Sequence, residues 1–375
     1  MSGTSRRRAA READRGGAGV GRAVEAILRA VRRRGDAALR DLTRRYDGVR
    51  RAAIEVGVRE KRSGVRAVSA PSVAALRLAA RRIAWFASRQ KRSLRPFRLR
   101  QAGLVLEQRL LPIERVGVYV PGGRYPLASS LLMGAIPARV AGCSEVVLCT
   151  PPRRDGTIAP EILVAAAIAG VDRIFAVGGA QAIAALAFGT ETVPRVDLIV
   201  GPGNRYVAAA KARLAGRVGI DVVAGPTELM VIVDGTSDAD RVSADLLAQA
   251  EHDAEARLWL VALPGAPVAA IRCRLGRDLS ELPRRSRLAA RASLGRLGLL
   301  RAADLEKAAA IANRLAPEHL SVQSASPRRL VPRLRHYGSL FLGPGSAVAF
   351  GDYLSGPNHI LPTAGSARHG GGLSV

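Results

Sequence analysis

The chain is expected to have an α/β fold made of two Rossmann-like units, each with a parallel sheet flanked by helices. Short β-branched runs alternate with alanine-rich stretches of helical length from about residue 116, and a second such series starts at about residue 229. Apolar residues at helical spacing between about 20 and 91 add an N-terminal helical segment. Together these three observations predict the fold class.

Length and composition agree with a globular protein. The chain has 375 residues, of which 48% are hydrophobic, so it can bury a large core in two or three structural units. No stretch approaches the roughly 18 apolar residues of a membrane span, and no apolar segment follows the N-terminal arginines as it would in a signal peptide. We therefore expect a cytoplasmic protein without a membrane partner.

The first 115 residues divide into a tail and a helical segment. Residues 1–19 are rich in arginine and glycine and lack a hydrophobic period, which predicts a disordered basic tail. Apolar residues then recur at helical spacing, are interrupted at Gly35-Asp36, and resume, which predicts a helical pair. A further helix is expected at 71–91.

The segment 116–228 is expected to be a Rossmann-like domain. Glycine-containing turns follow three of its predicted strands, at Pro121–Gly123, Gly178–Gln181 and Gly201–Asn204. None matches the G-x-G-x-x-G fingerprint, and each alone is typical of a tight turn. Because the carboxyl ends of parallel strands share one edge of a sheet, the three together predict a common ligand pocket. The expected strands are 116–120, 146–148, 173–177 and 198–200, and the expected helices are 127–141, 160–169, 180–188 and 205–214.

The second α/β series starts at residue 229 and is expected to form a discontinuous domain from residues 20–115 and 229–375. In this arrangement the N-terminal helices pack on the second unit, because they precede the first unit's opening strand. The expected strands are 229–233, 258–263, 298–300, 319–322 and 339–343, and the expected helices are 238–251, 265–276, 303–314 and 326–336, with an arginine-rich connection before 298.

The predicted helix 238–251 turns polar at its C-terminal end. Ser237 with Asp240 resembles an N-terminal capping box, and the apolar stripe of the helix continues into Gln249 and His252. A buried histidine is commonly a hydrogen-bonded core residue. However, Gln249 and His252 are three residues apart on one face, so both can reach one metal ion, and Asp352, expected in a loop, can add a carboxylate.

Glu318 and His319 are adjacent and follow Pro317, which disfavours helical geometry at Ala316 and places the pair in a loop or at a strand entrance. A histidine, and a glutamate if it is partly buried, are suitable acid-base groups near neutral pH. The dipeptide alone is weak evidence for catalysis. A Gly-Pro-Asn-rich segment that ends at His359 is expected to line a pocket.

The formal net charge of +27 also fits a nucleic-acid-binding protein. However, the surplus is almost entirely arginine, is dispersed along the chain, and is not interleaved with aromatic residues, which make up only 4% of the chain. We expect no specific nucleic-acid partner, only weak, salt-sensitive binding to polyanions. The three cysteines, Cys143, Cys149 and Cys273, lack metal-ligand spacing and are expected to be reduced, with Cys143 and Cys149 buried.

Seven motifs in order carry a resemblance to a known family: ERVGVYVPGG, VGGAQAIAALAFGTE, GPGN, AGPTELMV, LLAQAEHD, APEHL and GDYLSGPNHILPT. They resemble histidinol dehydrogenase, and the resemblance covers residues 22–375. It implies a zinc enzyme that oxidises L-histidinol to L-histidine through histidinal in two NAD-dependent steps, the last of histidine biosynthesis. It also implies a homodimer.

The resemblance assigns roles to residues that match the family's motifs. Glu318 and His319 would be the acid-base pair, with His319 taking the alcohol proton and Glu318 activating the water that hydrates the aldehyde. The zinc ligands would be Gln249, His252 and Asp352, and NAD would contact Tyr119, Gln181 and Asn204. The substrate site would be lined by Thr227, Gln249, His252, His319, Asp352 and His359.

One departure from the family pattern concerns the C-terminus. The family continues beyond the position of Val375 into a helical tail that carries a substrate-binding glutamate and a zinc-binding histidine, so the sequence predicts a truncated form with impaired activity. Two alternatives therefore stay open: a zinc- and NAD-dependent dehydrogenase of another small polar alcohol, and a non-catalytic basic binding protein.

Overall fold

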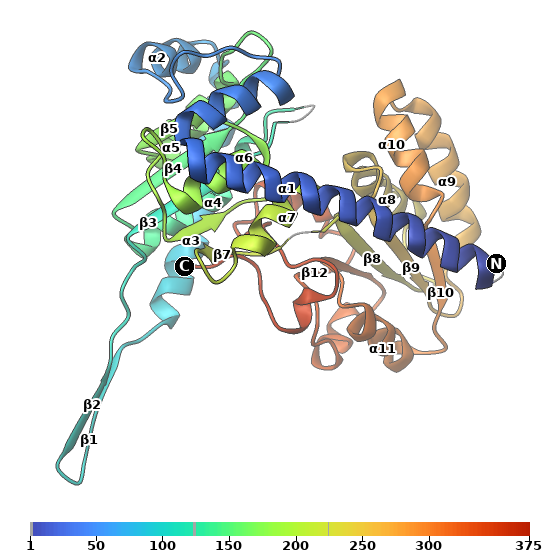
Figure 1. The fold of residues 1–375 in the computed structure, drawn as a ribbon. Helices are drawn as coiled ribbons and strands as arrows, with labels where there is room; N and C mark the ends of the chain where they lie inside the picture. The colour runs from blue at the N-terminus through green and yellow to red at the C-terminus, as the bar shows by residue number, and fades with distance from the viewer. Residues whose placement is uncertain (1–2, 123–124, 224) are drawn as a thin grey trace. The chain divides into compact units, whose positions relative to one another are not determined.

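Two five-stranded parallel sheets organise the chain, one in each of two units, residues 1–223 and 224–374 (Figure 1). The structure is a computed structural model that describes residues 3–122, 125–223 and 225–375, with side chains described from Gly19 onward. In both sheets the first strand is central, the next two strands lie on one side of it, and the last two lie on the other. This strand order confirms the predicted pair of Rossmann-like units.

The sheet of unit 1 has the order β5-β4-β3-β6-β7. Its strands are nearly all apolar and buried because helices cover both faces, as expected for a parallel sheet. The predicted strands and helices of this region are present, and β7 is an additional short edge strand. The bounds are β3 Arg115–Tyr119, α4 Ala128–Ala141, β4 Glu145–Thr150, α5 Pro160–Ala169, β5 Arg173–Ala176, α6 Gly179–Phe188, β6 Leu198–Val200, α7 Arg205–Leu214 and β7 Gly219–Ile220.

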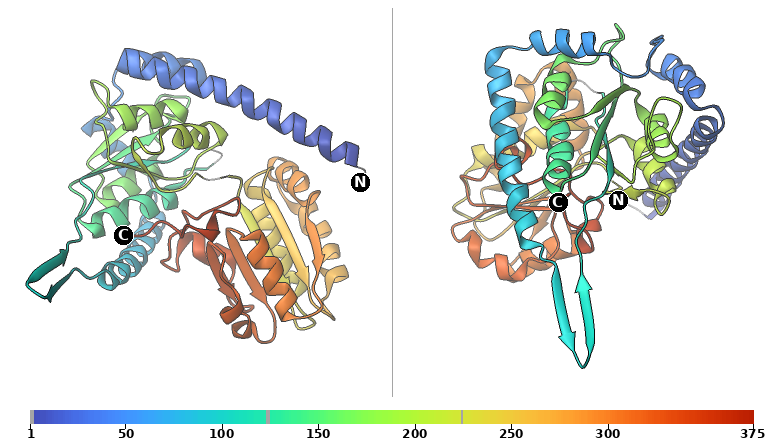
Figure 2. Two further views of the ribbon diagram at one scale, coloured as in Figure 1. Left: turned by 60° about the horizontal axis from the view of Figure 1, so that its bottom comes forward. Right: turned by 90° about the vertical axis from the view of Figure 1, so that its left-hand side faces the viewer.

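Three N-terminal helices belong to unit 1, which corrects the prediction that residues 20–115 join the second domain. Val24, Ile27 and Val31 of α1 enter the same core cluster as Phe175 and the alanines of α6, and α3 packs against α4 (Figure 2). The apolar stripe of α1 is therefore buried in unit 1, against α6 and α7. The bounds are α1 Gly3–Tyr46, α2 Val58–Arg66 and α3 Ala70–Ser93.

Helix α1 differs from the predicted tail and agrees with the predicted break. It begins at Gly3, inside the segment expected to be disordered, and alanine and arginine in that segment are strong helix formers. Residues 1 and 2 of the predicted tail lie outside the described residues. Gly35 has non-helical angles, with φ 50° and ψ −129°, so the helix is interrupted at the predicted Gly35-Asp36 position.

An antiparallel hairpin that the sequence analysis did not predict projects from unit 1 between α3 and β3 (Figure 2). Strands β1 Phe97–Gln101 and β2 Leu104–Gln108 are joined at Ala102-Gly103, both with positive φ as a tight two-residue turn requires. Leu99 pairs with Leu106, and every residue of both strands is exposed. The hairpin thus carries apolar side chains that unit 1 does not bury.

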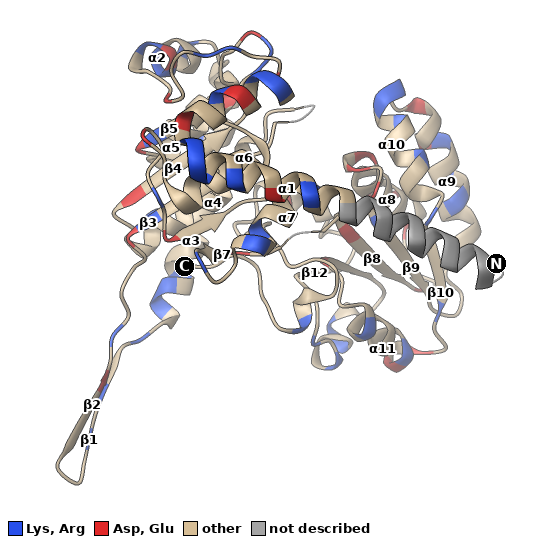
Figure 3. Cartoon of the chain, in the orientation of Figure 1, with Lys and Arg blue, Asp and Glu red and all other residues tan. Residues whose placement is uncertain are grey.

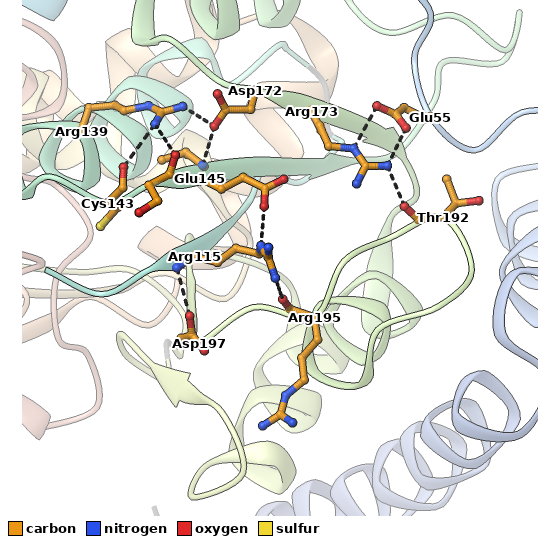
Figure 4. Close-up of polar contacts among 12 residues, drawn as sticks. Glu55, Arg115, Arg139, Cys143, Glu145, Asp172, Arg173, Thr192, Arg195 and Asp197 are labelled. Atoms are coloured by element: carbon orange, nitrogen blue, oxygen red, sulfur yellow. Dashed lines mark hydrogen bonds and ion pairs between the residues drawn. The ribbon is translucent and has the colours of Figure 1, made fainter.

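Ion pairs close the amino-terminal edge of the unit 1 sheet (Figure 4). Arg115, the first residue of β3, pairs with Glu145, the first residue of β4, and its backbone N–H donates to Asp197. Arg173, the first residue of β5, pairs with Glu55 at 2.7 Å. These side chains are between about one quarter and two fifths exposed. The glycine turns lie at the opposite, carboxyl-terminal edge.

Unit 2 repeats this architecture with the order β10-β9-β8-β11-β12. Side chains alternate along β8: Leu229, Val231 and Val233 face the core under α8 and α9, whereas Met230 and Ile232 face the core under α11. The bounds are β8 Glu228–Val233, α8 Ala239–His252, β9 Arg257–Ala262, α9 Val268–Glu281, α10 Arg284–Leu294, β10 Gly298–Arg301, α11 Leu305–Leu315, β11 His319–Gln323, β12 Ser339–Leu342 and α12 Val348–Tyr353.

Two predictions for unit 2 are wrong. The arginine-rich connection contains helix α10, whose buried face is made of small residues such as Ala289 and Ser293. The predicted helix 326–336 is replaced by two short 3-10 turns, η1 Pro327–Arg329 and η2 Val331–Arg333, because Pro332, in the interior of the predicted helix, removes an N–H group that an α-helix needs.

Basic residues are spread over many elements of both units, as the sequence indicates (Figure 3). Cys143 and Cys149 are free and buried, as predicted, while Cys273 is free and exposed. Among the helices in the described ranges, none is both long and apolar enough to cross a bilayer.

Candidate active site

Most of the predicted catalytic and substrate-binding residues of unit 2 gather at the amino-terminal edge of its sheet. Thr227 immediately precedes β8, Glu318 immediately precedes β11, and His319 is the first residue of β11. Strands β8 and β11 are neighbours, with His319 paired to Leu229. Ligands of open α/β sheets usually bind beyond the carboxyl ends of the strands, so this cluster uses the less common edge.

Helix α8 returns to this edge because it runs back along the sheet from the carboxyl end of β8. Its N-cap is Asp238, which accepts hydrogen bonds from the N–H groups of Asp240 and Arg241, so the predicted cap at Ser237 is wrong. At the other end Gln249 is buried, and its Nε2 donates to Thr227 Oγ1. This bond leaves the amide oxygen of Gln249 available as a metal ligand.

The Glu318 carboxylate is buried at the centre of the cluster. Its Oε2 accepts hydrogen bonds from Thr227 Oγ1 at 2.7 Å and from the backbone N–H of Glu228 at 2.9 Å. Burial outweighs these bonds and raises the pKa of Glu318 to about 7. Ala316 ends α11 with φ 49°, so the backbone leaves helical geometry before the pair, as Pro317 predicts. Glu318 is thus poised to exchange a proton near neutral pH.

The His319 ring is oriented by Glu228, the residue of β8 whose N–H also binds Glu318. Its Nδ1 lies 3.0 Å from the carbonyl oxygen of Glu228, and because a carbonyl oxygen can only accept, Nδ1 carries the proton in the neutral ring. Burial lowers the pKa of His319, so its Nε2 is the free, unprotonated atom. Nε2 lies 4.0 Å from a carboxylate oxygen of Asp352.

Asp352 lies on the short helix α12 and not in the predicted loop. Its carboxylate is 4.0 Å from His319 and 3.9 Å from Nδ1 of His359, so it joins two histidines of the cluster. Burial raises the pKa of Asp352 to about 6 and lowers that of His359 to about 4. Nε2 of His359 is buried and has no hydrogen-bond partner among the described residues.

His252 ends α8 at the margin of the cluster and is exposed. It lies close enough to Glu318 and His359 to interact electrostatically with both. All seven unit 2 residues assigned from the family motifs therefore belong to one neighbourhood: Thr227, Gln249, His252, Glu318, His319, Asp352 and His359.

The residues predicted to bind NAD lie in unit 1, at the carboxyl-terminal edge of its sheet. Tyr119 ends β3 and is buried, with its hydroxyl accepting the backbone N–H of Gly179 at 3.0 Å. Gln181 is buried in the first turn of α6, and Asn204 caps α7 from an exposed position. These positions agree with the predicted glycine-loop edge. Gly123, in the first of the three glycine turns, lies outside the described residues.

Comparison with known proteins identifies the family of this chain. The family model described as histidinol dehydrogenase matches residues 10–375. The chain belongs to the histidinol dehydrogenase family. It is 48% identical over 357 residues to the histidinol dehydrogenase of Methylococcus capsulatus, covering 94% of this chain and 81% of that protein. It is 47% identical over 352 residues to that of Thermus thermophilus, with 94% and 83% covered.

A solved structure of histidinol dehydrogenase from Elizabethkingia anophelis has the same fold. The two chains superpose with a TM-score of 0.89 at 37% sequence identity, over 94% of this chain and 81% of the other. The predicted family and fold class are thereby confirmed, and with them an NAD- and zinc-dependent oxidoreductase of histidine biosynthesis that acts on the CH–OH group of a small-molecule substrate, histidinol.

Histidinol dehydrogenases use zinc, and the unit 2 cluster contains side chains that can serve as its ligands. Among the described residues, no three His, Cys, Asp or Glu side chains lie close enough together to hold a metal ion by themselves. A zinc site in this cluster therefore needs a donor of another type, and the amide oxygen of Gln249 is available. Two observations favour a cation here. Asp352 and Glu318 are buried carboxyl groups with raised pKa values, and His359 is held neutral with an unpartnered buried nitrogen. The donors present therefore fit a zinc ion.

Proposed function

We propose that the amino-edge cluster of unit 2 is the site of histidinol oxidation, with Glu318 and His319 as its two proton-transfer groups. The observation that carries this proposal is the backbone of Glu228, whose N–H binds the carboxylate of Glu318 while its carbonyl oxygen binds Nδ1 of His319. The backbone of this one residue thus orients both the Glu318 carboxylate and the His319 ring. Its position at the start of the central strand makes that setting rigid.

In the first oxidation, Nε2 of His319 accepts the hydroxyl proton of histidinol while hydride leaves the carbinol carbon for NAD, which produces histidinal and NADH. The orientation of His319 supports this role because its Nδ1 is already occupied and its Nε2 is free. General-base catalysis of this kind typically contributes about 10²–10⁴-fold to a rate. The hydrogen bond to Glu228 fixes the ring before substrate binds.

In the second oxidation, the deprotonated Glu318 accepts a proton from water as the water oxygen bonds to the aldehyde carbon. Hydride then leaves the hydrated carbon for a second NAD, and the carboxylate of histidine forms. Together the two steps consume one water and release two NADH and three protons. The pKa of Glu318, raised to about 7, supports its role as a base near neutral pH.

The remaining residues of the neighbourhood would hold zinc and substrate. We assign Gln249, His252 and Asp352 to zinc, which when bound supplies a Lewis acid that holds substrate donor atoms in place. Thr227 and His359 would line the substrate site with them. In unit 1, Tyr119, Gln181 and Asn204 would contact NAD, which supplies the hydride acceptor.

Separate assays of the two oxidations test these roles. With histidinal as substrate, Glu318→Gln should lose activity strongly, whereas hydride transfer from histidinol should be affected less; His319→Asn should suppress both reactions. Matched controls are Glu281→Gln, which alters an exposed carboxylate of α9, and His336→Asn, which alters a half-buried histidine outside the cluster. A Glu318→Gln variant slowed only with histidinol would reverse the assignment.

We also propose that the protein is a cytoplasmic homodimer. The resemblance to the family supports the dimer, and so does the β1–β2 hairpin, because a two-stranded hairpin with exposed apolar residues is marginal in water and normally packs against something. Sedimentation equilibrium should give twice the chain mass. A Leu99→Asp variant should weaken association, and a Glu107→Gln variant in the same hairpin is the control; a monomeric parent chain would reject the dimer.

A further inference from the structure

A fully buried ion pair lies beside the last of the three glycine turns in unit 1. Nζ of Lys211, on α7, is 2.6 Å from Oδ1 of Asp221, which follows β7. The two side chains are 2% and 0% exposed. Neither residue belongs to the proposed catalytic, zinc or NAD contacts, so the function described above leaves this pair unexplained.

Both charged groups bind backbone atoms of the same residue, Gly201. Oδ2 of Asp221 accepts the N–H of Gly201 at 2.7 Å, and Nζ of Lys211 donates to the carbonyl oxygen of Gly201 at 2.5 Å. Strand β3 leaves no room for a side chain at this position, because a Cβ atom on residue 201 would lie 2.0 Å from the carbonyl oxygen of Tyr119. With φ 116°, Gly201 also holds a conformation that other residues rarely adopt.

We call Lys211 and Asp221, together with their hydrogen bonds to Gly201, the clamp. Its position matters because Gly201 is the first residue of the Gly201–Asn204 turn. That turn leaves β6 next to β3, at the point where the strand order of the sheet reverses, and it ends at the N-cap of α7. Ligands of doubly wound sheets bind at this reversal point, where backbone N–H groups and a helix N-terminus are available. The clamp therefore holds the turn at the edge where Tyr119 and Asn204 lie.

A buried ion pair is poorly explained by stability alone. Removing two charges from water costs about as much as their attraction returns, and well-packed apolar residues often serve stability as well or better. The amino-terminal edge of the same sheet shows the alternative, since the Arg115–Glu145 and Arg173–Glu55 pairs stay partly exposed there (Figure 4). Complete burial at the carboxyl edge thus points to a demand for fixed geometry.

We propose that Lys211 and Asp221 are positioning residues that hold the Gly201–Asn204 turn in the conformation that receives NAD. This rests on the proposed NAD site of unit 1. Loss of the clamp leaves the N–H and the carbonyl oxygen of Gly201 without these partners and lets the turn and the start of α7 shift. The chemical groups of unit 2 are unchanged by this, so the effect falls on cofactor binding and not on the chemical steps.

Three variants test the proposal: Lys211→Met, Asp221→Asn and the double variant Lys211→Met/Asp221→Leu. Each should raise KM for NAD at least tenfold, while kcat at saturating NAD and KM for histidinol stay within twofold. The double variant should melt above either single variant, because it leaves no unpaired buried charge. A role in stability alone would instead restore KM for NAD along with the melting temperature in the double variant, and that result would overturn the proposal.

Two further variants separate this inference from the NAD assignment. Glu145→Gln breaks an ion pair at the opposite edge of the same sheet and should leave KM for NAD unchanged. Asn204→Ala should raise KM for NAD if the NAD site is correctly assigned. If Asn204→Ala raises it and the clamp variants do not, the clamp proposal fails alone. If the clamp variants raise it and Asn204→Ala does not, the clamp is supported and the Asn204 contact is rejected.

Discussion

Nδ1 of His319 lies 3.0 Å from the carbonyl oxygen of Glu228, across the boundary between two neighbouring parallel strands. This contact settles which ring nitrogen carries the proton and directs the other nitrogen toward Asp352. The adjacent N–H of Glu228 binds Glu318. The catalytic proposal depends on this one residue of β8, and several predictions derive from it.

The pH dependence of histidinal oxidation should report the pKa of Glu318. Burial raises that pKa to about 7, and the proposed base must be deprotonated, so kcat/KM for histidinal should rise with pH and level off above about 8. The profile is measured with zinc and NAD saturating. In Glu318→Gln the remaining activity should lose this rise; an unchanged profile in that variant would assign the titration to another group.

Thr227→Val should shift the same profile to higher pH. The hydroxyl of Thr227 donates to Glu318 at 2.7 Å and lowers its pKa, so removing it raises the pKa above about 7. Histidinal oxidation at pH 7 should fall severalfold and recover at pH 9. Thr236→Val, a change in an exposed turn of the same unit, is the control. A loss of activity that is equal at both pH values would contradict the proposed effect on Glu318.

Zinc binding should depend on His252 and not on His336. We expect His252→Ala to weaken zinc affinity by at least about tenfold, since even indirect partners of a metal site typically contribute that much. Zinc bound per chain is measured after dialysis against buffered zinc. The His336→Ala variant, changed outside the cluster, should match the parent chain. Equal zinc content in all three would reject His252 as a ligand.

Asp47 should limit stability above neutral pH. Its Oδ2 is buried without a partner among the described residues, and burial raises its pKa from 3.8 to about 6. The folded state therefore binds the proton more tightly than the unfolded state. The stability from this group is complete below about pH 4 and is lost as pH rises through about 6.

Asp47→Asn should therefore stabilise the chain at pH 8 by on the order of 1 kcal/mol, allowing for partial solvent access, and should have little effect at pH 4. The measurement is chemical denaturation at both pH values. Asp41→Asn, on α1 just before Asp47, is the control with the opposite expectation, because Asp41 pairs with Arg34, which lowers its pKa. Equal stabilisation by Asp47→Asn at both pH values would show that its charge is not responsible.

The sequence was sufficient for the elements whose apolar period is strong, and insufficient where short-range signals conflict. The strands of both sheets are apolar runs flanked by turns, so their alternation with helices predicted the fold. Helix α10 was missed because its buried face is made of alanine and serine, which carry no apolar period. The β1–β2 hairpin was missed because its strands mix arginine with leucine and bury neither.

Site residues were predicted from motif matches, while their arrangement required the structure. Glu318 and His319 could be named because of their types and their position after Pro317. Glu228 was missed because it acts through backbone atoms, which leave no signal in the sequence. The clamp on Gly201 was missed for a related reason, since Lys211 and Asp221 come together only when α7 and β7 fold back on β6.

The central claim, that Glu318 and His319 divide the proton transfers of two successive oxidations, is tested most directly by counting NADH per histidinol in a single turnover. With enzyme in excess over histidinol and NAD saturating, the parent chain should form two NADH and one histidine. Glu318→Gln should form one NADH rapidly and stop with histidinal, which can be trapped by an amine nucleophile. Two NADH from Glu318→Gln, formed in phases slowed equally, would contradict the account.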